Sequence, residues 1–152
     1  MQERFKNFTV LIAKISRSIR RIKTEEMEEF NLKSPHVSCL YYLYKESSLT
    51  AKELCDICQE DKSALSRSIE YLENNGYITC NSDLKKRYKS SLVLTEKGKE
   101  IAIIIANKID NILNTASQGL SEENRIILYE SLNLISENLN NICENYGDKY
   151  GD

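Results

Sequence analysis

The sequence is poor in the residues that interrupt helices. Its 152 residues include only five glycines and one proline, and because these residues mark most turns and breaks, long helices should dominate the fold. No hydrophobic run approaches the ~20 residues that a membrane-spanning helix needs. The amphipathic N-terminus also lacks the apolar core and the cleavage site of a signal peptide. We therefore expect a cytoplasmic protein with no membrane partner.

The motifs of common enzymes are missing as well. The sequence contains no phosphate-binding loop, no dinucleotide-binding glycine motif, no nucleophile elbow and no zinc-protease motif. His36 is the single histidine, and the scattered carboxylates give it no evident acid–base partner. We therefore expect no enzymatic activity and no cofactor, and we interpret His36 as structural or partly exposed.

Five cysteines are an odd number, and without an export signal they predict reduced thiols rather than a disulfide framework. Cys55 and Cys58 form a Cys-x-x-Cys pair, an arrangement that can be redox-active or can supply half of a zinc site. A zinc site needs further ligands, and the sequence has neither a second such pair nor a pair of histidines. We expect no metal, and a thiol- or metal-responsive role of Cys55 and Cys58 stays an alternative.

The net charge of −2 conceals an uneven distribution along the chain. Residues 2–23 hold seven basic residues and one acidic residue, and residues 61–99 hold eight basic and five acidic residues. From residue 121 to the end, seven acidic residues outnumber two basic ones. The basic middle is compatible with a nucleic-acid partner, which the total charge alone would disfavour.

Capping residues and hydrophobic spacing predict the elements of the fold. Apolar residues from Phe5 to Ile22 predict an amphipathic helix that ends at the acidic cluster 25–29. The predicted caps of later helices are Ser34 for a helix to Glu46, Thr50 in a capping box with Glu53, Asp61 for 62–74, Thr95 for a helix to about Leu113, and Ser121 for the last helix. Runs at 77–80 and 91–94 predict two strands around the polar, basic segment 81–90, which makes a β-hairpin with an exposed basic tip.

Two short helices in close succession, followed by a basic hairpin, suit duplex DNA. The second helix of a helix-turn-helix enters the major groove, which is about 12 Å wide, and presents its N-terminal half to base edges. On the helix 62–74, Leu65 and Ile69 face the core, and the polar side chains face solvent. The DNA-binding candidates are Lys62, Ser63, Ser66 and Arg67 on this helix and Lys85, Lys86, Arg87 and Lys89 in the hairpin. Hairpin cations would neutralise phosphates and make the affinity fall with salt.

The stretches LTAKEL (49–54), KSALSR (62–67), LENNGYI (72–78) and LVLTEKG (92–98), followed by LSEE (120–123), resemble the MarR family of bacterial transcriptional regulators. The resemblance implies a mainly α fold, a winged helix-turn-helix with a small β-hairpin wing and N- and C-terminal dimerisation helices. One position departs from the family. Its wing commonly carries an Asp-x-Arg pair, and the corresponding positions here hold Lys86 and Tyr88.

On this basis we expect a single MarR-like domain over 1–152, with a winged-helix part at 34–95 and dimerisation helices at 1–30 and 96–146. The spacing of apolar residues in the terminal helices suits pairing between two copies, and packing within one chain is the alternative. The resemblance implies a two-fold homodimer on a near-palindromic site in double-stranded DNA, because two recognition helices would meet major grooves about 34 Å apart.

The resemblance further implies a repressor that a small-molecule effector can release. The effector would bind between the dimerisation helices and the winged part, where Arg17, Tyr41 and Tyr42 are the candidate ligand-binding residues. A winged helix that binds another protein instead of DNA is the remaining alternative.

Overall fold

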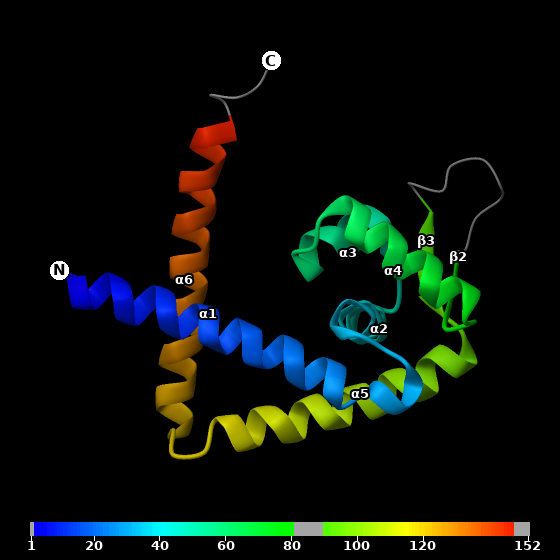
Figure 1. The fold of residues 1–152 in the computed structure, drawn as a ribbon, viewed down its shortest axis with the longest axis horizontal. Helices are drawn as coiled ribbons and strands as arrows, with labels where there is room; N and C mark the ends of the chain where they lie inside the picture. Colours follow the sequence, from blue (N-terminus) through cyan, green and yellow to red (C-terminus); the bar gives the residue numbers. More distant parts are fainter. Residues whose placement is uncertain (1, 81–89, 148–152) are drawn as a thin grey trace. The chain divides into compact units, whose positions relative to one another are not determined.

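The computed structural model describes residues 2–80 and 90–147, which form a mainly helical fold with a small sheet (Figure 1). The elements are α1 (Gln2–Glu25), the 3-10 helix η1 (Glu28–Phe30), α2 (Ser34–Glu46), β1 (Leu49–Thr50), α3 (Ala51–Cys58), α4 (Lys62–Asn74), β2 (Ile78–Cys80), β3 (Ser91–Leu94), α5 (Glu96–Ala116) and α6 (Glu122–Gly147). The predicted mainly α winged helix-turn-helix fold is confirmed. Within the described ranges, no helix is both long and apolar enough to cross a bilayer.

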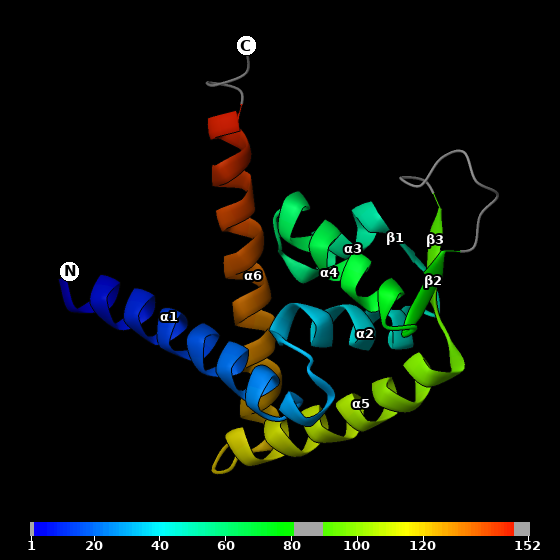
Figure 2. The ribbon, with the colours of Figure 1, turned by 45° about the vertical axis from the view of Figure 1, so that its right-hand side comes forward.

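The chain divides into two compact units, Met1–Asp110 and Asn111–Asp152, and the boundary falls within α5. The first unit contains the hydrophobic core. α2 contributes Val37, Cys39, Leu40 and Leu43 to that core and packs against α1, α3, α4 and β3. Figures 1 and 2 show α2 between the α3–α4 pair and α5.

Local hydrogen bonds explain where the helices begin. At the start of α3, the backbone N–H of Thr50 donates to the carboxylate of Glu53 (2.8 Å), and the N–H of Glu53 donates back to the Thr50 hydroxyl (3.2 Å). Asp61 accepts from the N–H of Ala64 at 2.8 Å. The hydroxyls of Thr95 and Ser121 accept in the same way from Gly98 (3.0 Å) and Asn124 (3.2 Å). These four predicted caps are confirmed.

The predicted cap at Ser34 is wrong by one residue. Ser34 is already the first residue of α2, and Lys33 occupies the cap position. The backbone N–H of Lys33 donates to Nδ1 of His36 (3.1 Å), and the N–H of Ser34 donates to the Thr24 hydroxyl (3.2 Å). The histidine ring therefore supplies an acceptor that the sequence pattern did not indicate. His36 also stacks on Tyr71, with ring centroids 4.3 Å apart, which confirms its structural role.

A three-stranded antiparallel sheet of order β1-β3-β2 closes one side of the first unit. β3 pairs with both neighbours, with Leu49 opposite Leu92 and Ile78 opposite Leu94. β2 and β3 confirm the two predicted strands, whereas β1 was not predicted. Gly98 lets α5 start against Tyr77, the residue before β2, because a Cβ atom there would collide with the backbone carbonyl oxygen of Tyr77. β2 also packs against α4.

Candidate nucleic-acid interface

The turn between α3 and α4 sets the position of the second helix. Gln59 ends α3 in the left-handed conformation (φ 53°), and Asp61 returns the chain to an extended conformation as the N-cap of α4. Between them, the backbone carbonyl of Glu60 accepts a hydrogen bond from the Cys55 thiol at 3.0 Å. The conformation of Gln59, the hydrogen bond to Glu60 and the cap at Asp61 together fix the turn. They therefore also fix the position of the N-terminus of α4.

α4 has one buried face and one exposed face. Leu65, Ser68 and Leu72 are buried, and Ile69 is half-buried against the core. The predicted DNA-binding residues of this helix lie on the exposed face: Lys62, Ser63, Ser66 and Arg67. Glu70, one turn beyond Ser66, is exposed as well. The spacing of three and four residues places these side chains together along about two turns.

Two adjoining hollows lie along one side of α4. One, of about 390 Å³, lies between α4 and the sheet and is lined by residues that include Ser66, Glu70 and Leu92. The other, of about 270 Å³, lies between α3 and α4 and is lined by residues that include Lys52 and Lys62. Both hollows are lined by Ala51, Ser66 and Ile69, so they open on the same side of the helix.

The electrostatics of α4 favour an anion at its N-terminal end. Lys62 is the first residue of the helix and Arg67 follows within two turns, while the first turn holds no acidic residue. The helix dipole adds a positive potential at the same place, and the Asp61 carboxylate, which accepts from the N–H of Ala64, offsets part of it. This end of α4 can therefore bind a phosphate as well as reach base edges.

Four of the predicted DNA-binding residues belong to the basic hairpin segment. Lys85, Lys86, Arg87 and Lys89 lie within residues 81–89, outside the described residues. The strands that lead to and from this segment are described: β2 and β3 pair antiparallel, Cys80 opposite Leu92, and β2 packs against α4 (Figure 2). Cys80, the last described residue before this segment, therefore lies beside α4.

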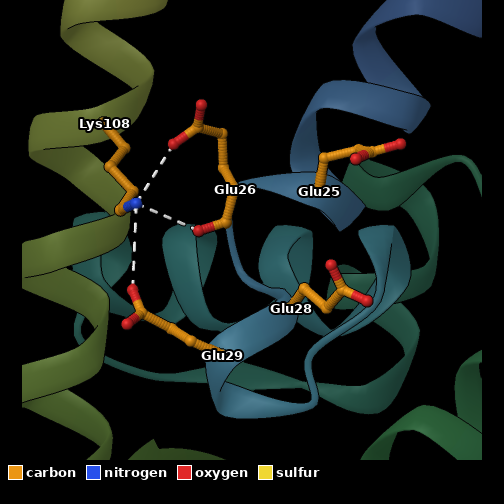
Figure 3. Close-up of a pocket in the computed structure, with 5 residues that line it drawn as sticks. All are labelled: Glu25, Glu26, Glu28, Glu29 and Lys108. Atoms are coloured by element: carbon orange, nitrogen blue, oxygen red, sulfur yellow. Dashed lines mark hydrogen bonds and ion pairs between the residues drawn. The ribbon is translucent and has the colours of Figure 1, made fainter.

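An acidic hollow in the same unit does not belong to this interface. It has a volume of about 520 Å³ and is lined by Glu25, Glu26, Glu28, Glu29 and Lys108 (Figure 3). Lys108 pairs with Glu26 at 3.0 Å and with Glu29 at 4.0 Å. Four carboxylates around one ammonium group would repel a phosphate backbone, so a polyanion is disfavoured here.

The candidate effector residues lie on two helices. Tyr41 and Tyr42 of α2 are half-buried and meet edge to face, with centroids 5.4 Å apart, and the ammonium of Lys45 lies 5.5 Å from the Tyr41 ring. Burial raises the pKa of Tyr42, and the nearby Cys58 adds to the increase. Arg17 lies on the exposed surface of α1. The fold therefore brings Tyr41 and Tyr42 into contact with each other, and Tyr41 also contacts Lys45.

The thiols are arranged differently from the Cys-x-x-Cys interpretation. Cys55 donates to the backbone carbonyl of Glu60, and Cys58 lies half-buried against the core that contains the fully buried Cys39 of α2. The influence of Cys39, and then the ammonium of Lys23, lowers the pKa of Cys58, while Cys58 and burial raise the pKa of Cys39. Sequence spacing could not indicate this relationship, because the two residues lie on different helices. Within 2–80 and 90–147, no group of three or more His, Cys, Asp or Glu is placed to hold a metal ion.

Comparisons with known proteins agree with this geometry. The sequence model described as "Winged helix DNA-binding domain" matches residues 36–113. The uncharacterized HTH-type transcriptional regulator YybA of Bacillus subtilis (strain 168) is 22% identical over 128 residues, which are 84% of this chain and 85% of that protein.

Two solved structures are similar over most of the chain. A MarR family transcriptional regulator from Listeria monocytogenes, complexed with 26mer DNA, has a TM-score of 0.81 and 26% identity and covers 93% of both chains. The MepR–DNA complex from S. aureus has a TM-score of 0.76 and 21% identity and covers 87% of this chain and 97% of that one. At 21% identity, the similarity to MepR supports the fold alone.

Proposed function

Because the chain belongs to the winged helix DNA-binding domain family and has the fold of MarR-family regulators, we propose that it controls transcription by binding a specific sequence of double-stranded DNA with α4. The resemblance to the MarR family inferred from the sequence is confirmed. The family is one of DNA-binding domains rather than of enzymes. The observation that carries the proposal is that α4 buries its apolar face in the core and exposes its polar face to solvent.

The residues of that face have different proposed roles. Arg67 binds a guanine edge or a phosphate, and Ser63 and Ser66 donate to bases or to the backbone. Lys62, at the positive end of the helix, binds phosphate. Lys85, Lys86, Arg87 and Lys89 are proposed to follow the backbone or the minor groove, on the strength of their charge and of the place where β2 and β3 leave the fold.

We propose a homodimer on a near-palindromic site. α1 exposes Phe8, Ile12, Ile15 and Ile19, and α6 exposes Leu128, Leu132, Leu139 and Ile142. Each stripe repeats at helical spacing, and a second copy would remove it from water at roughly 25 cal/mol per Å². In this scheme residues 1–30 and 96–146 form the dimerisation helices and 34–95 the DNA-binding part of one domain. A cytoplasmic location follows from a DNA partner.

The proposal also includes regulation by a small-molecule effector. A small molecule that contacts Tyr41, Tyr42 and Arg17 would bear on α2, which packs against both α3 and α4. If the small molecule bound one arrangement of these helices more strongly, it would favour that arrangement. In the dimer, the distance between the two α4 helices would then change, and a repressor would be released from DNA.

The test is a selection of bound sequences from random duplex DNA, followed by affinity measurements on the selected site. We expect a site with two-fold symmetry, and we expect Arg67→Ala to weaken it by about 1–3 kcal/mol and to relax the preference at one base pair per half-site. Arg21→Ala is the matched control, since Arg21 is also exposed but lies on α1 and pairs with Glu25. Absence of any saturable, salt-sensitive complex would favour a protein-binding module instead.

A further inference from the structure

An acidic side chain, Glu70, lies on the exposed face of α4 in one row with two of the proposed DNA contacts. Lys62, Ser66 and Glu70 follow one another at intervals of four residues and are all exposed, so they share one side of the helix. The two hollows along α4 follow this row, because Lys62 and Ser66 line one of them and Ser66 and Glu70 line the other. A duplex bound along this face would therefore meet the carboxylate of Glu70.

The carboxylate of Glu70 does not serve to hold the fold together. No ion pair between described residues includes it, although Arg67 lies three residues away on the same face. Beside the phosphates of a duplex, such a carboxylate is repelled and lowers the affinity for every sequence. It is compatible with tight binding only where it meets a hydrogen-bond donor, and in the major groove the donors belong to bases.

The four bases offer a carboxylate different groups in the major groove. Cytosine presents its N4 amino group, which donates, and adenine presents a donating N6 amino group beside the acceptor N7. Guanine presents two acceptors, and thymine presents one acceptor and a methyl group. Because an ionised carboxylate only accepts hydrogen bonds, it bonds to cytosine without facing an acceptor of the same base. It is repelled by guanine and by thymine.

We propose that Glu70 reads a cytosine through the N4 amino group and so specifies one further base pair of the DNA site. The inference rests on the proposed function and extends base recognition from Arg67 and the serines of α4 to an acidic residue. Glu70 follows Arg67 by three residues, which is about 4.5 Å along the helix axis. Since successive base pairs are about 3.4 Å apart, the cytosine belongs to the base pair next to the one that Arg67 contacts.

The test compares the sequences that the unmodified protein and three variants select from random duplex DNA, and then the Kd values for sites that differ at one base pair. We expect the unmodified protein to prefer cytosine over thymine roughly tenfold at one position per half-site. Glu70→Ala should lose this preference and should bind random duplex more tightly, because it removes a repelled charge. Glu70→Gln should prefer adenine at this position, since an amide can accept from N6 and donate to N7.

The third variant, Glu73→Gln, is the matched control. Glu73 lies on the same helix and lines the same hollow of about 390 Å³, but it is less exposed than Glu70. Its substitution removes the same charge, and the preference for cytosine should remain. Retention of that preference in Glu70→Ala would overturn the inference.

Two further outcomes separate this inference from its alternatives. If Glu70→Ala instead lost the preference at the base pair that Arg67→Ala affects, Glu70 would position Arg67, and the assigned reading of cytosine would be wrong. If the unmodified protein enriched no sequence at all, the proposed function would fail and this inference with it. A selected site that the Glu70 variants leave unchanged would refute the inference alone.

Discussion

The ammonium of Lys108 on α5 lies 3.0 Å from both the carboxylate and the backbone carbonyl oxygen of Glu26, in the segment that follows α1 (Figure 3). Glu29 adds a weaker pairing at 4.0 Å. The ammonium thus joins residues 82 positions apart in the sequence, and it offsets the repulsion among the four carboxylates of the acidic hollow.

Removal of this cation should destabilise the fold in a salt-dependent manner. The groups are partly exposed, which limits the effect of Lys108→Met to about 1 kcal/mol in the free energy of unfolding at low salt. The loss should shrink at 1 M salt, where screening acts over roughly 3 Å. Urea unfolding at both salt concentrations measures it, with Lys99→Met, which removes the exposed pair with Glu96, as the control. Equal effects of the two substitutions would contradict this account.

The sequence predicted best the features that depend on neighbouring residues. Thr50 and Asp61 were identified as caps because their acceptors serve backbone groups three residues away. The strand β1 was missed because two residues carry no periodicity, and its pairing with β3 depends on contacts across the fold. The influence of Cys39 on the pKa of Cys58 was missed for the same reason, because only tertiary packing brings α2 and α3 together.

Acid should weaken the start of α3 through Glu53. The backbone N–H and the hydroxyl of Thr50 lower the pKa of this carboxyl from its usual value near 4.5. A carboxyl with a lowered folded-state pKa adds stability above its unfolded-state value, and that stability disappears as the pH falls through the lower one. As the pH falls below 5, the Glu53→Gln variant should therefore lose less stability than the unmodified protein. Thermal unfolding across this pH range measures the difference. A curve parallel to that of the unmodified protein would exclude this role.

His36 should add a second pH dependence at milder acidity. Burial, and then the charge of Lys33, lower its pKa below the ordinary 6.5. The folded state therefore prefers the neutral ring, whose Nδ1 accepts from Lys33, and stability should decline as the pH falls below about 6.5. His36→Phe keeps an aromatic ring against Tyr71 and should flatten the profile between pH 7 and 5, at some constant cost for the lost hydrogen bond. Urea midpoints across this range test it, and an unchanged slope would contradict it.

Two glycines should respond to alanine for different reasons. At Gly98 a Cβ atom would collide with the carbonyl oxygen of Tyr77, which is backbone and cannot rotate away. At Gly76 nothing lies within 4 Å of such an atom, but φ is +73°. We expect about 1–2 kcal/mol of destabilisation for Gly76→Ala and a larger loss for Gly98→Ala, because the start of α5 must move away from the backbone of Tyr77. Equilibrium unfolding ranks the two, and the reverse order would refute the close approach at Gly98.

The hairpin cations should control how DNA affinity depends on salt rather than on sequence. Each phosphate contact releases condensed counterions, so the slope of log K against log salt changes by about 0.9 per contact on duplex DNA. Alanine at Lys85, Lys86 and Arg87 should lower that slope and weaken selected and random duplexes by similar factors. Arg67→Ala should instead reduce the difference between those duplexes. If the hairpin substitutions changed the base preference and left the slope intact, the hairpin would read bases, and its proposed role on the backbone would be wrong.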